Sequence, residues 1–273
     1  MSPDGSGEKL RDEFLQQINY VQSGGNLGTS KAFNIGLSRA CGKYVLWLNT
    51  DILLKENFIK KLFDYMEDNA HCGICGGNVL DYEGKPAHSF CRKFPNLKTL
   101  RRSQCVVYLL LCKIFRRRFF DQYNYSNRPM KVGYITGADM MIRRELFDVV
   151  GNFDEDIFMY GEESEFTYRV VHRTAMSVIS VPHAKIYHLE GASFSKNKGF
   201  NLSRYRISVL GTMRMYQKCY GTTAGLKYLN IVRKGRIRRR NLCLLLFNKK
   251  LAERYLQQKE ILDSIISEME KNK

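Results

Sequence analysis

The stretch Tyr44-Val45-Leu46-Trp47-Leu48-Asn49-Thr50-Asp51 decides the fold class that this sequence predicts. Together with Lys43, its first five residues form an almost continuous apolar run. Such a run is typical of a central, parallel strand that is buried on both faces. The run ends abruptly in polar residues, and ligands of open α/β sheets bind beyond the carboxyl ends of the strands. The stretch therefore predicts an α/β protein with a ligand site at the end of this strand.

Two interpretations of Asp51 stay open on its local pattern alone. A carboxylate at the end of a strand is well placed to hold a hard divalent cation through oxygen. The other interpretation is that Asp51 only caps the helix predicted over residues 55–69, because Asp is a favoured N-cap residue. Taken by itself, the position favours neither interpretation.

Other segments alternate between helical and extended patterns, as in an α/β domain. Apolar positions three or four residues apart predict helices over residues 8–17, 29–40, 55–69, 143–150, 161–173 and 200–220. Short apolar runs predict strands over residues 18–21, 73–80, 132–142 and 176–182.

A glycine-rich turn, Gly24-Gly25-Asn26-Leu27-Gly28, leads into the helix predicted over residues 29–40. Asn34 and Gly36 lie near the middle of that helix, where both residue types lower helix propensity. Tight packing of the helix on a sheet would favour them, and so would a phosphate-bearing ligand that approaches the helix N-terminus. Packing is the preferred interpretation, because this glycine pattern is not specific.

An acidic cluster occurs at Gly161-Glu162-Glu163-Ser164-Glu165, with three carboxylates in four positions. Like charges this close repel, and burial would raise their pKa values. On composition alone the cluster is a solvated helix start, because carboxylates favour the positive N-terminal end of a helix. Asp51 upstream and His188 downstream change that interpretation. A strand-end carboxylate, a later acidic cluster and a later histidine can form one pocket in an α/β fold.

The chain is strongly basic, with 44 Lys+Arg against 27 Asp+Glu and a formal net charge of +17. This balance suggests an anionic partner such as nucleic acid, anionic lipid or a phosphorylated substrate. Basic residues flank the apolar run Val106-Val107-Tyr108-Leu109-Leu110-Leu111-Cys112, which predicts an interfacial helix on an anionic membrane. The alternative is a core helix with a solvated basic end.

The cysteines indicate a reducing compartment. Eight of them lie scattered, several within apolar runs, which favours buried free thiols over a disulfide framework. Cys72 and Cys75 form a Cys-x-x-Cys pair, but no second pair follows at zinc-like spacing, so a metal or redox role is not expected. No segment reaches the roughly 20 apolar residues of a membrane span, and no secretory signal is recognised. We expect a cytoplasmic protein, peripheral on the inner face of the membrane.

Six short motifs resemble family 2 glycosyltransferases of the GT-A fold, especially their rhamnosyltransferase-like branch. The motifs are Asn26-Leu27-Gly28 with Asn34-Ile35-Gly36, Tyr44-Val45-Leu46-Trp47-Leu48-Asn49-Thr50-Asp51, Gly137-Ala138-Asp139-Met140-Met141-Ile142-Arg143-Arg144, Gly151-Asn152-Phe153-Asp154-Glu155, Phe158-Met159-Tyr160-Gly161-Glu162-Glu163-Ser164-Glu165, and His188 through Gly191-Ala192-Ser193. Each motif alone is weak, but six in this order are specific. The resemblance implies a GT-A, Rossmann-like, mostly parallel sheet with flanking helices over residues 1–200. A basic helical appendage over residues 201–273 would follow it.

The resemblance also implies roles for individual residues. Asp51, at the family's Asp-x-Asp position, would bind Mg²⁺ or Mn²⁺ on the donor diphosphate, and His188 would approach the metal or the diphosphate. Glu163 matches the expected general base, although the family has aspartate there and glutamate is one methylene longer. Glu162 and Glu165 would orient the acceptor or the base. The implied donor-binding residues are Asn26, Gly28, Asn34, Asn49 and Gly137.

The implied activity is inverting transfer of a sugar from a nucleotide-diphospho-sugar to a hydroxyl of a glycan or a polyprenyl-diphosphate-linked acceptor, in cell-surface polysaccharide synthesis. The competing hypothesis is an inactive GT-A relic that binds anionic membrane or nucleic acid. Nucleic acid is the less favoured partner, because the sequence has no recognisable nucleic-acid motif.

The N-terminus suggests a further expectation. Ser2-Pro3-Asp4-Gly5-Ser6 resembles the end of the family's second-strand motif, upstream of which the family has a first strand and a helix. A βαβ unit of roughly 30 or more residues would then be missing. The strand over residues 44–48 would lack a neighbour on one edge, and we expect poor solubility and weak binding of sugar nucleotide. The alternative is a genuine short variant whose sheet starts at Ile18.

Overall fold

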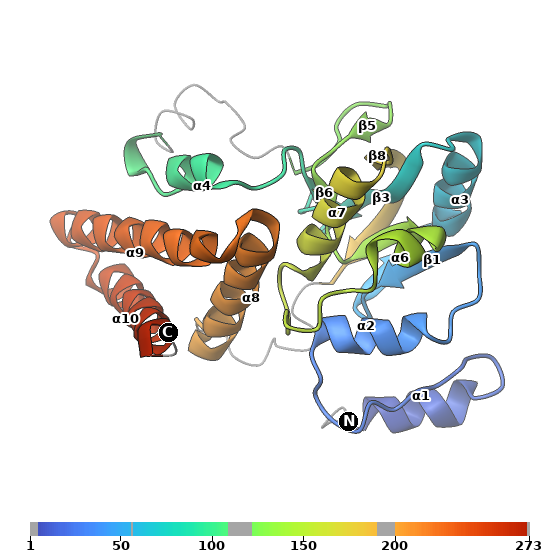
Figure 1. Cartoon of the computed structure of the whole chain (residues 1–273), viewed down its shortest axis with the longest axis horizontal. Helices are drawn as coiled ribbons and strands as arrows, with labels where there is room; N and C mark the ends of the chain where they lie inside the picture. The colour runs from blue at the N-terminus through green and yellow to red at the C-terminus, as the bar shows by residue number, and fades with distance from the viewer. Residues whose placement is uncertain (1–4, 56, 109–121, 190–199, 272–273) are drawn as a thin grey trace.

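The computed structural model describes residues 5–55, 57–108, 122–189 and 200–271 (Figure 1). Its helices are α1 (Ser6–Phe14), α2 (Thr29–Leu37), α3 (Phe58–Asp68), α4 (Leu97–Ser103), α6 (Glu145–Val150), α7 (Glu162–Arg173), α8 (Leu202–Tyr220), α9 (Thr222–Leu245) and α10 (Lys249–Lys271). Its strands are β1 (Tyr44–Leu48), β2 (Ile52–Leu54), β3 (Cys72–Leu80), β4 (Phe90–Cys91), β5 (Met130–Lys131), β6 (Tyr134–Ile135), β7 (Asp139–Arg143) and β8 (Ser177–His188).

The main sheet has the order β1-β7-β3-β8-β2, and β5 also pairs with β8. The sheet is mixed, because β3 and β8 run parallel. The pairs β1–β7, β3–β7, β2–β8 and β5–β8 are antiparallel. The α/β class is therefore confirmed, but within the described strands antiparallel pairs outnumber the parallel pair, where the sequence predicted a mostly parallel sheet.

The central, parallel position that the apolar pattern predicted for β1 is wrong, whereas the expectation that residues 44–48 lack a neighbour on one edge agrees with the described sheet. In the described sheet β1 is an end strand with β7 as its only strand partner, and the pairing is antiparallel. Its apolar run has a different cause: residues of β1 pack on both faces of the sheet. Val45 and Trp47 pack with α2 and α6, whereas Leu46 and Leu48 pack with α3.

Two other local predictions are also wrong, and one of the two open interpretations of Asp51 is excluded. Residues 18–21 form no strand, and Ile18 and Val21 are exposed without a neighbouring strand to pair with. The strand predicted over residues 132–142 is interrupted near Gly137, so that β6 and β7 are separate strands. Asp51 does not cap a helix, because β2 follows it and α3 begins after its N-cap residue Asn57.

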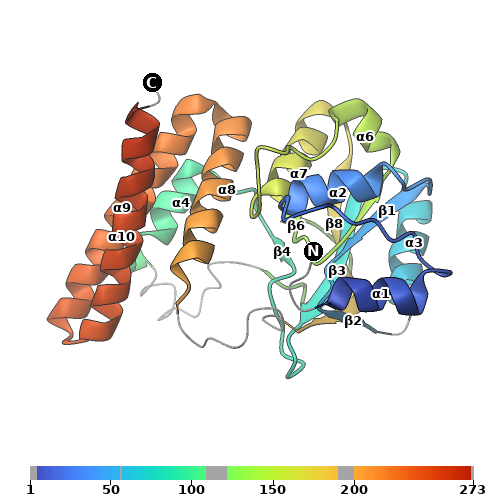
Figure 2. The same ribbon diagram turned by 90° about the horizontal axis from the view of Figure 1, so that it is seen from below.

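Two apolar clusters sandwich the sheet, and a third lies outside it. On one face α2, α6 and α7 pack around Trp47, Phe147 and Phe166. On the other face α3 packs through Phe58 and Leu62. The third cluster joins α8, α9 and α10 to α4, and Figures 1 and 2 both show these helices beside the sheet layer rather than over it.

Within the described part of the predicted helical region, α8, α9 and α10 follow the predicted pattern, and α10 begins two residues before the expected Leu251. Its separation from residues 1–200 as a domain stays a prediction. Among the helices of the described ranges, none combines the length and apolar composition that a membrane span requires. The interfacial helix predicted around residues 106–112 falls mostly in residues 109–121, outside the described residues.

Candidate active site

A cleft of about 950 Å³ lies between the end of β1, the start of α7, and helices α8 and α9. Six of the residues predicted from the sequence line it: Asn49, Asp51, Gly137, Glu162, Glu163 and His188. These residues come from four separate segments of the chain. The cleft therefore joins the strand-end carboxylate, the acidic cluster and the histidine, as the sequence predicted.

Asp51 and His188 meet because β2 and β8 pair side by side. In that antiparallel pair Ile52 lies opposite His188, and the amide of Leu189 donates to the carbonyl of Asp51 at 2.8 Å. The register brings His188 Nε2 to 3.0 Å from Asp51 Oδ1. Asn49 Nδ2 lies 3.4 Å from the same nitrogen. Three polar side chains thus converge where β1 ends.

A divalent cation would fit these side chains. Carboxylate oxygen is a ligand for Mg²⁺ and Mn²⁺, and imidazole is a common metal ligand. Within the described ranges, no three or more His, Cys, Asp or Glu side chains form a group that could hold a metal ion. Asp51 and His188 would supply two ligands, which suits a cation that takes its remaining ligands from substrate phosphates and water.

Gly137 shapes the neighbouring wall of the cleft. The amide of Asn49 donates to the carbonyl of Ala138 at 3.3 Å, which ties this loop to the end of β1. A Cβ atom at Gly137 would lie 2.9 Å from Trp47 Cζ2. Glycine is therefore required for the loop to lie against the indole ring.

Glu162 and Glu163 begin α7 and line the same cleft. Burial raises the pKa of both carboxyl groups, and the charge of Glu163 raises the pKa of Glu162 further. Glu163 Oε2 accepts a long hydrogen bond of 3.4 Å from the amide of Gly161, whereas Glu162 Oε2 is buried without a partner. Raised pKa values suit groups that exchange protons near neutral pH.

The backbone just before α7 lies in direct contact with the backbone of α8. Gly161 has φ of 118°, and a Cβ atom at Gly211 would lie 2.1 Å from the carbonyl oxygen of Met159. Only glycine at position 211 allows this approach without a shift. The contact brings α8, and α9 behind it, against the carboxylates of α7.

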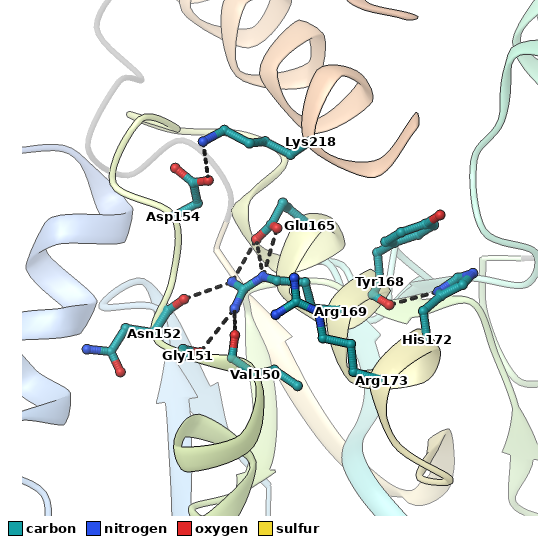
Figure 3. Close-up of a pocket in the computed structure, with 10 residues that line it drawn as sticks. All are labelled: Val150, Gly151, Asn152, Asp154, Glu165, Tyr168, Arg169, His172, Arg173 and Lys218. Atoms are coloured by element: carbon teal, nitrogen blue, oxygen red, sulfur yellow. Dashed lines mark hydrogen bonds and ion pairs between the residues drawn. The ribbon is translucent and has the colours of Figure 1, made fainter. Parts of the chain in front are cut away.

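Glu165, predicted to orient the acceptor or the base, does not line this cleft. Its carboxylate pairs with Arg169, at 2.7 Å from Nη2 and 2.8 Å from Nε (Figure 3). Arg169 also donates to the carbonyls of Val150, Gly151 and Asn152. Figure 3 shows the two side chains at a separate, smaller pocket, so their contacts hold the loop after α6 against α7.

Three predicted donor-binding residues also lie away from the cleft lining. Asn34 donates to the carbonyl of Phe153 at 2.9 Å and accepts from its amide at 3.1 Å. Asn26 Oδ1 accepts from the amide of Gly28 at 3.3 Å, and the next amide, of Thr29, donates to Phe158. These contacts favour the packing interpretation of the glycine-rich turn and α2, and direct donor contact stays a prediction.

The helical wall of the cleft was missed by sequence reasoning. Arg204, Ser208 and Thr212 of α8 line it, together with Tyr228, Val232 and Arg236 of α9. A signal existed, because both sets recur every four residues and so lie on one face of each helix. Arg204 Nε donates to Tyr160 Oη at 2.7 Å, and Arg236 Nε donates to Tyr205 Oη at 3.2 Å.

The family model described as glycosyl transferase family 2 matches residues 1–151. The chain therefore belongs to this family. It is 24% identical over 200 residues to the dTDP-rhamnosyl transferase RfbF of Shigella flexneri, covering 71% of this chain and 59% of RfbF. It is also 24% identical over 224 residues to the N-acetylglucosaminyl-diphospho-decaprenol L-rhamnosyltransferase of Mycobacterium tuberculosis, covering 76% of this chain and 70% of that protein.

The solved structures support the fold. GalNAc-T7, crystallised with UDP, GalNAc and Mn²⁺, superposes with a TM-score of 0.51 at 17% identity, covering 85% of this chain and 46% of GalNAc-T7. The family model thus confirms the family that the sequence resembles, and the superposition confirms the fold.

Proposed function

We propose that this chain is an inverting glycosyltransferase that moves a sugar, with rhamnose the favoured candidate, from a nucleotide-diphospho-sugar to a hydroxyl of a lipid-linked or glycan acceptor. One observation carries the proposal: Asp51 with His188 and Glu162 with Glu163 line a single cleft. The names of RfbF and of the mycobacterial relative support the rhamnosyl donor, and a role in cell-surface polysaccharide synthesis stays a prediction. The relatives do not favour the alternative of an inactive binding relic.

Asp51 and His188 form the donor side of the reaction. They would hold Mg²⁺ or Mn²⁺ at the donor diphosphate, and the crystallisation of GalNAc-T7 with Mn²⁺ supports this. When bound, the ion neutralises negative charge that grows on the leaving diphosphate. Asn49 extends the same polar site through its contact with His188.

Glu163 forms the acceptor side. Its carboxylate takes the proton from the acceptor hydroxyl while the hydroxyl oxygen forms the new bond to the anomeric carbon. The bond from that carbon to the diphosphate breaks, and the nucleoside diphosphate leaves with the electron pair. Attack from the face opposite the leaving group inverts the anomeric centre. Glu162 shares the buried site, and the charge of Glu163 raises the pKa of the Glu162 carboxyl group.

Arg236 is our candidate for binding the acceptor diphosphate. Its half-buried guanidinium lines the cleft, donates to Tyr205 and lies over the Tyr205 ring at 5.7 Å. Among the described residues, no carboxylate forms an ion pair with Arg236, whereas the nearby Arg206 and Arg233 pair with Glu268 and Asp263. A cation of this kind suits a phosphate group. The mycobacterial relative's name includes a diphospho-decaprenol, which supports a polyprenyl-diphosphate-linked acceptor.

The test is turnover of a panel of nucleotide-diphospho-sugars by the full chain, with and without Mn²⁺ or Mg²⁺. We expect metal-dependent turnover of one donor class, with dTDP-rhamnose as the first candidate. Salt-sensitive binding to any polyanion without turnover of any donor would contradict the proposal and favour the relic.

A further inference from the structure

The turn between α9 and α10 exposes four consecutive apolar side chains, residues 244–247, which we call the apolar tip. The exposed fractions are 45% for Leu244, 75% for Leu245, 67% for Leu246 and 89% for Phe247. Among the large apolar side chains of the described residues, Phe247 is the most exposed. Exposed apolar patches of this kind mark sites of interaction with protein or membrane.

The tip is held outward by an ordered turn. The amide of Asn248 donates to the carbonyl of Cys243 at 2.8 Å, and the amide of Phe247 donates to Leu244 at 3.1 Å. Asn248 Oδ1 then accepts from the amide of Leu251 at 3.1 Å, at the start of α10. Phe247 has φ of 54°, a left-handed conformation that usually takes glycine at a helix end. Position 247 thus bears an exposed aromatic side chain. A glycine there would adopt the left-handed backbone without strain and would expose no apolar side chain to solvent.

Positive charge surrounds the tip. Arg238 and Arg240 precede it on α9, and Lys249 and Lys250 follow it after Asn248. From residue 222 to residue 252 the sequence has no Asp or Glu. Apolar side chains rimmed by lysine and arginine fit the interface of an anionic bilayer, where the apolar groups reach the acyl chains and the cations contact lipid phosphates. The charge therefore favours anionic lipid over an apolar protein partner.

We infer that the apolar tip inserts into the interfacial region of an anionic membrane and anchors the protein there. In Figure 1 the α9–α10 turn lies at the left end of the molecule, away from the sheet. Arg236 precedes Leu245 by nine residues, which is about 13 Å along the helix at 1.5 Å per residue. The anchor would hold the arginine-bearing wall of the cleft close to the headgroup layer, where a lipid-linked diphosphate lies. This consequence for the acceptor rests on the proposed function.

The first test is sedimentation of the full chain with vesicles of phosphatidylglycerol and phosphatidylcholine, compared with pure phosphatidylcholine vesicles. We expect binding to the anionic vesicles that weakens with salt, because exposed charges are screened. The double variant Leu245→Asp/Phe247→Asp should bind at least about tenfold more weakly. Val149→Asp, at an exposed apolar position of α6, is the matched control and should bind as the unchanged chain does.

The second test uses brominated phosphatidylglycerol vesicles, whose acyl chains quench nearby tryptophan. Phe247→Trp should be quenched, whereas Val149→Trp should not. Both variants keep Trp47, which is buried at 2% exposure and contributes the same background to each. A Val107→Asp variant distinguishes membrane binding by the apolar tip from membrane binding by the apolar run that begins at residue 106. Val107 suits this purpose because its side chain is 64% exposed.

Undiminished vesicle binding by the double variant would overturn the inference, and so would loss of binding in Val107→Asp alone. Equal quenching of the two tryptophan variants would do the same. If light scattering instead shows a dimer that only the double variant abolishes, the tip binds a second copy and the inference is also wrong. These tests need no substrate, so their failure is distinguishable from a failure to turn over sugar nucleotides.

Discussion

The two walls of the cleft differ in charge and in their origin. The wall at the end of the sheet is made by short strands and the start of α7, and it bears the carboxylates of Asp51, Glu162 and Glu163. The opposite wall is made by two long helices and bears Arg204 and Arg236. We infer a division of labour, in which the carboxylate wall activates the reactants and the arginine wall holds an anionic acceptor.

Among the substitutions in the carboxylate wall, removal of the proposed metal ligand should cause the largest loss of activity. Asp51→Ala should abolish metal-dependent transfer and leave the fold intact, because a side chain at a strand end contributes little packing. Product formation at several Mn²⁺ concentrations and thermal unfolding would be measured together. Asp148→Ala, at an exposed position of α6, is the control. Unchanged activity of the Asp51 variant would remove this residue from the site.

Removing the base should have the next largest effect. Glu163→Gln keeps the shape of the side chain but removes its basicity, and we expect kcat to fall by about 10²–10⁴-fold while donor binding survives. In the unchanged chain the rate should rise with pH through the raised pKa of Glu163, because only the deprotonated carboxylate accepts the proton. Should Glu162→Gln prove crippling and Glu163→Gln harmless, the two roles are exchanged.

Substitutions in the arginine wall should change the KM for the acceptor rather than kcat. Arg236→Gln should raise the acceptor KM by roughly tenfold, since a charge-assisted contact contributes about 1.5–3 kcal/mol at most sites. Hydrolysis of the donor in the absence of acceptor should not change. Arg238→Gln is the matched control, because Arg238 is exposed and lies two positions along the same helix. A lower kcat with an unchanged acceptor KM would contradict the proposed division.

The smallest effect concerns Asp139, a carboxyl beneath the carboxylate wall. Burial raises its pKa from 3.8 to about 8, although the amide of Gly77 donates to Oδ2 at 2.6 Å. The folded state therefore holds a proton that the unfolded state releases. The resulting stability is complete below the unfolded pKa and is lost as pH rises toward the folded pKa.

Asp139→Asn should remove this dependence on pH. The free energy of unfolding of the variant should exceed that of the unchanged chain by about 1–3 kcal/mol at high pH. The difference should grow between pH 3.8 and about pH 8 and then stay constant. Urea denaturation across this range measures it. A constant difference at every pH would mean that Asp139 is not protonated in the folded state.

The sequence by itself determined many of the local elements and six of the residues that line the cleft. Apolar spacing predicted α2, α3, α7 and α8, because helix periodicity is a property of neighbouring residues. The resemblance to family 2 glycosyltransferases identified Asp51, Glu163 and His188 as members of one site, and the structure brings these residues to one cleft. It also predicted the class of fold, which the helices and strands confirm.

Only the tertiary structure decided how distant segments meet. The meeting of Asp51 and His188 depends on the β2–β8 register, and no local pattern predicts β2. The antiparallel pairing of β1 was hidden because helices cover both faces of the sheet, which makes an apolar end strand resemble a central, parallel one. Likewise, Glu165 resembled its acidic neighbours in sequence, yet it faces Arg169 because one helix directs successive side chains to different sides.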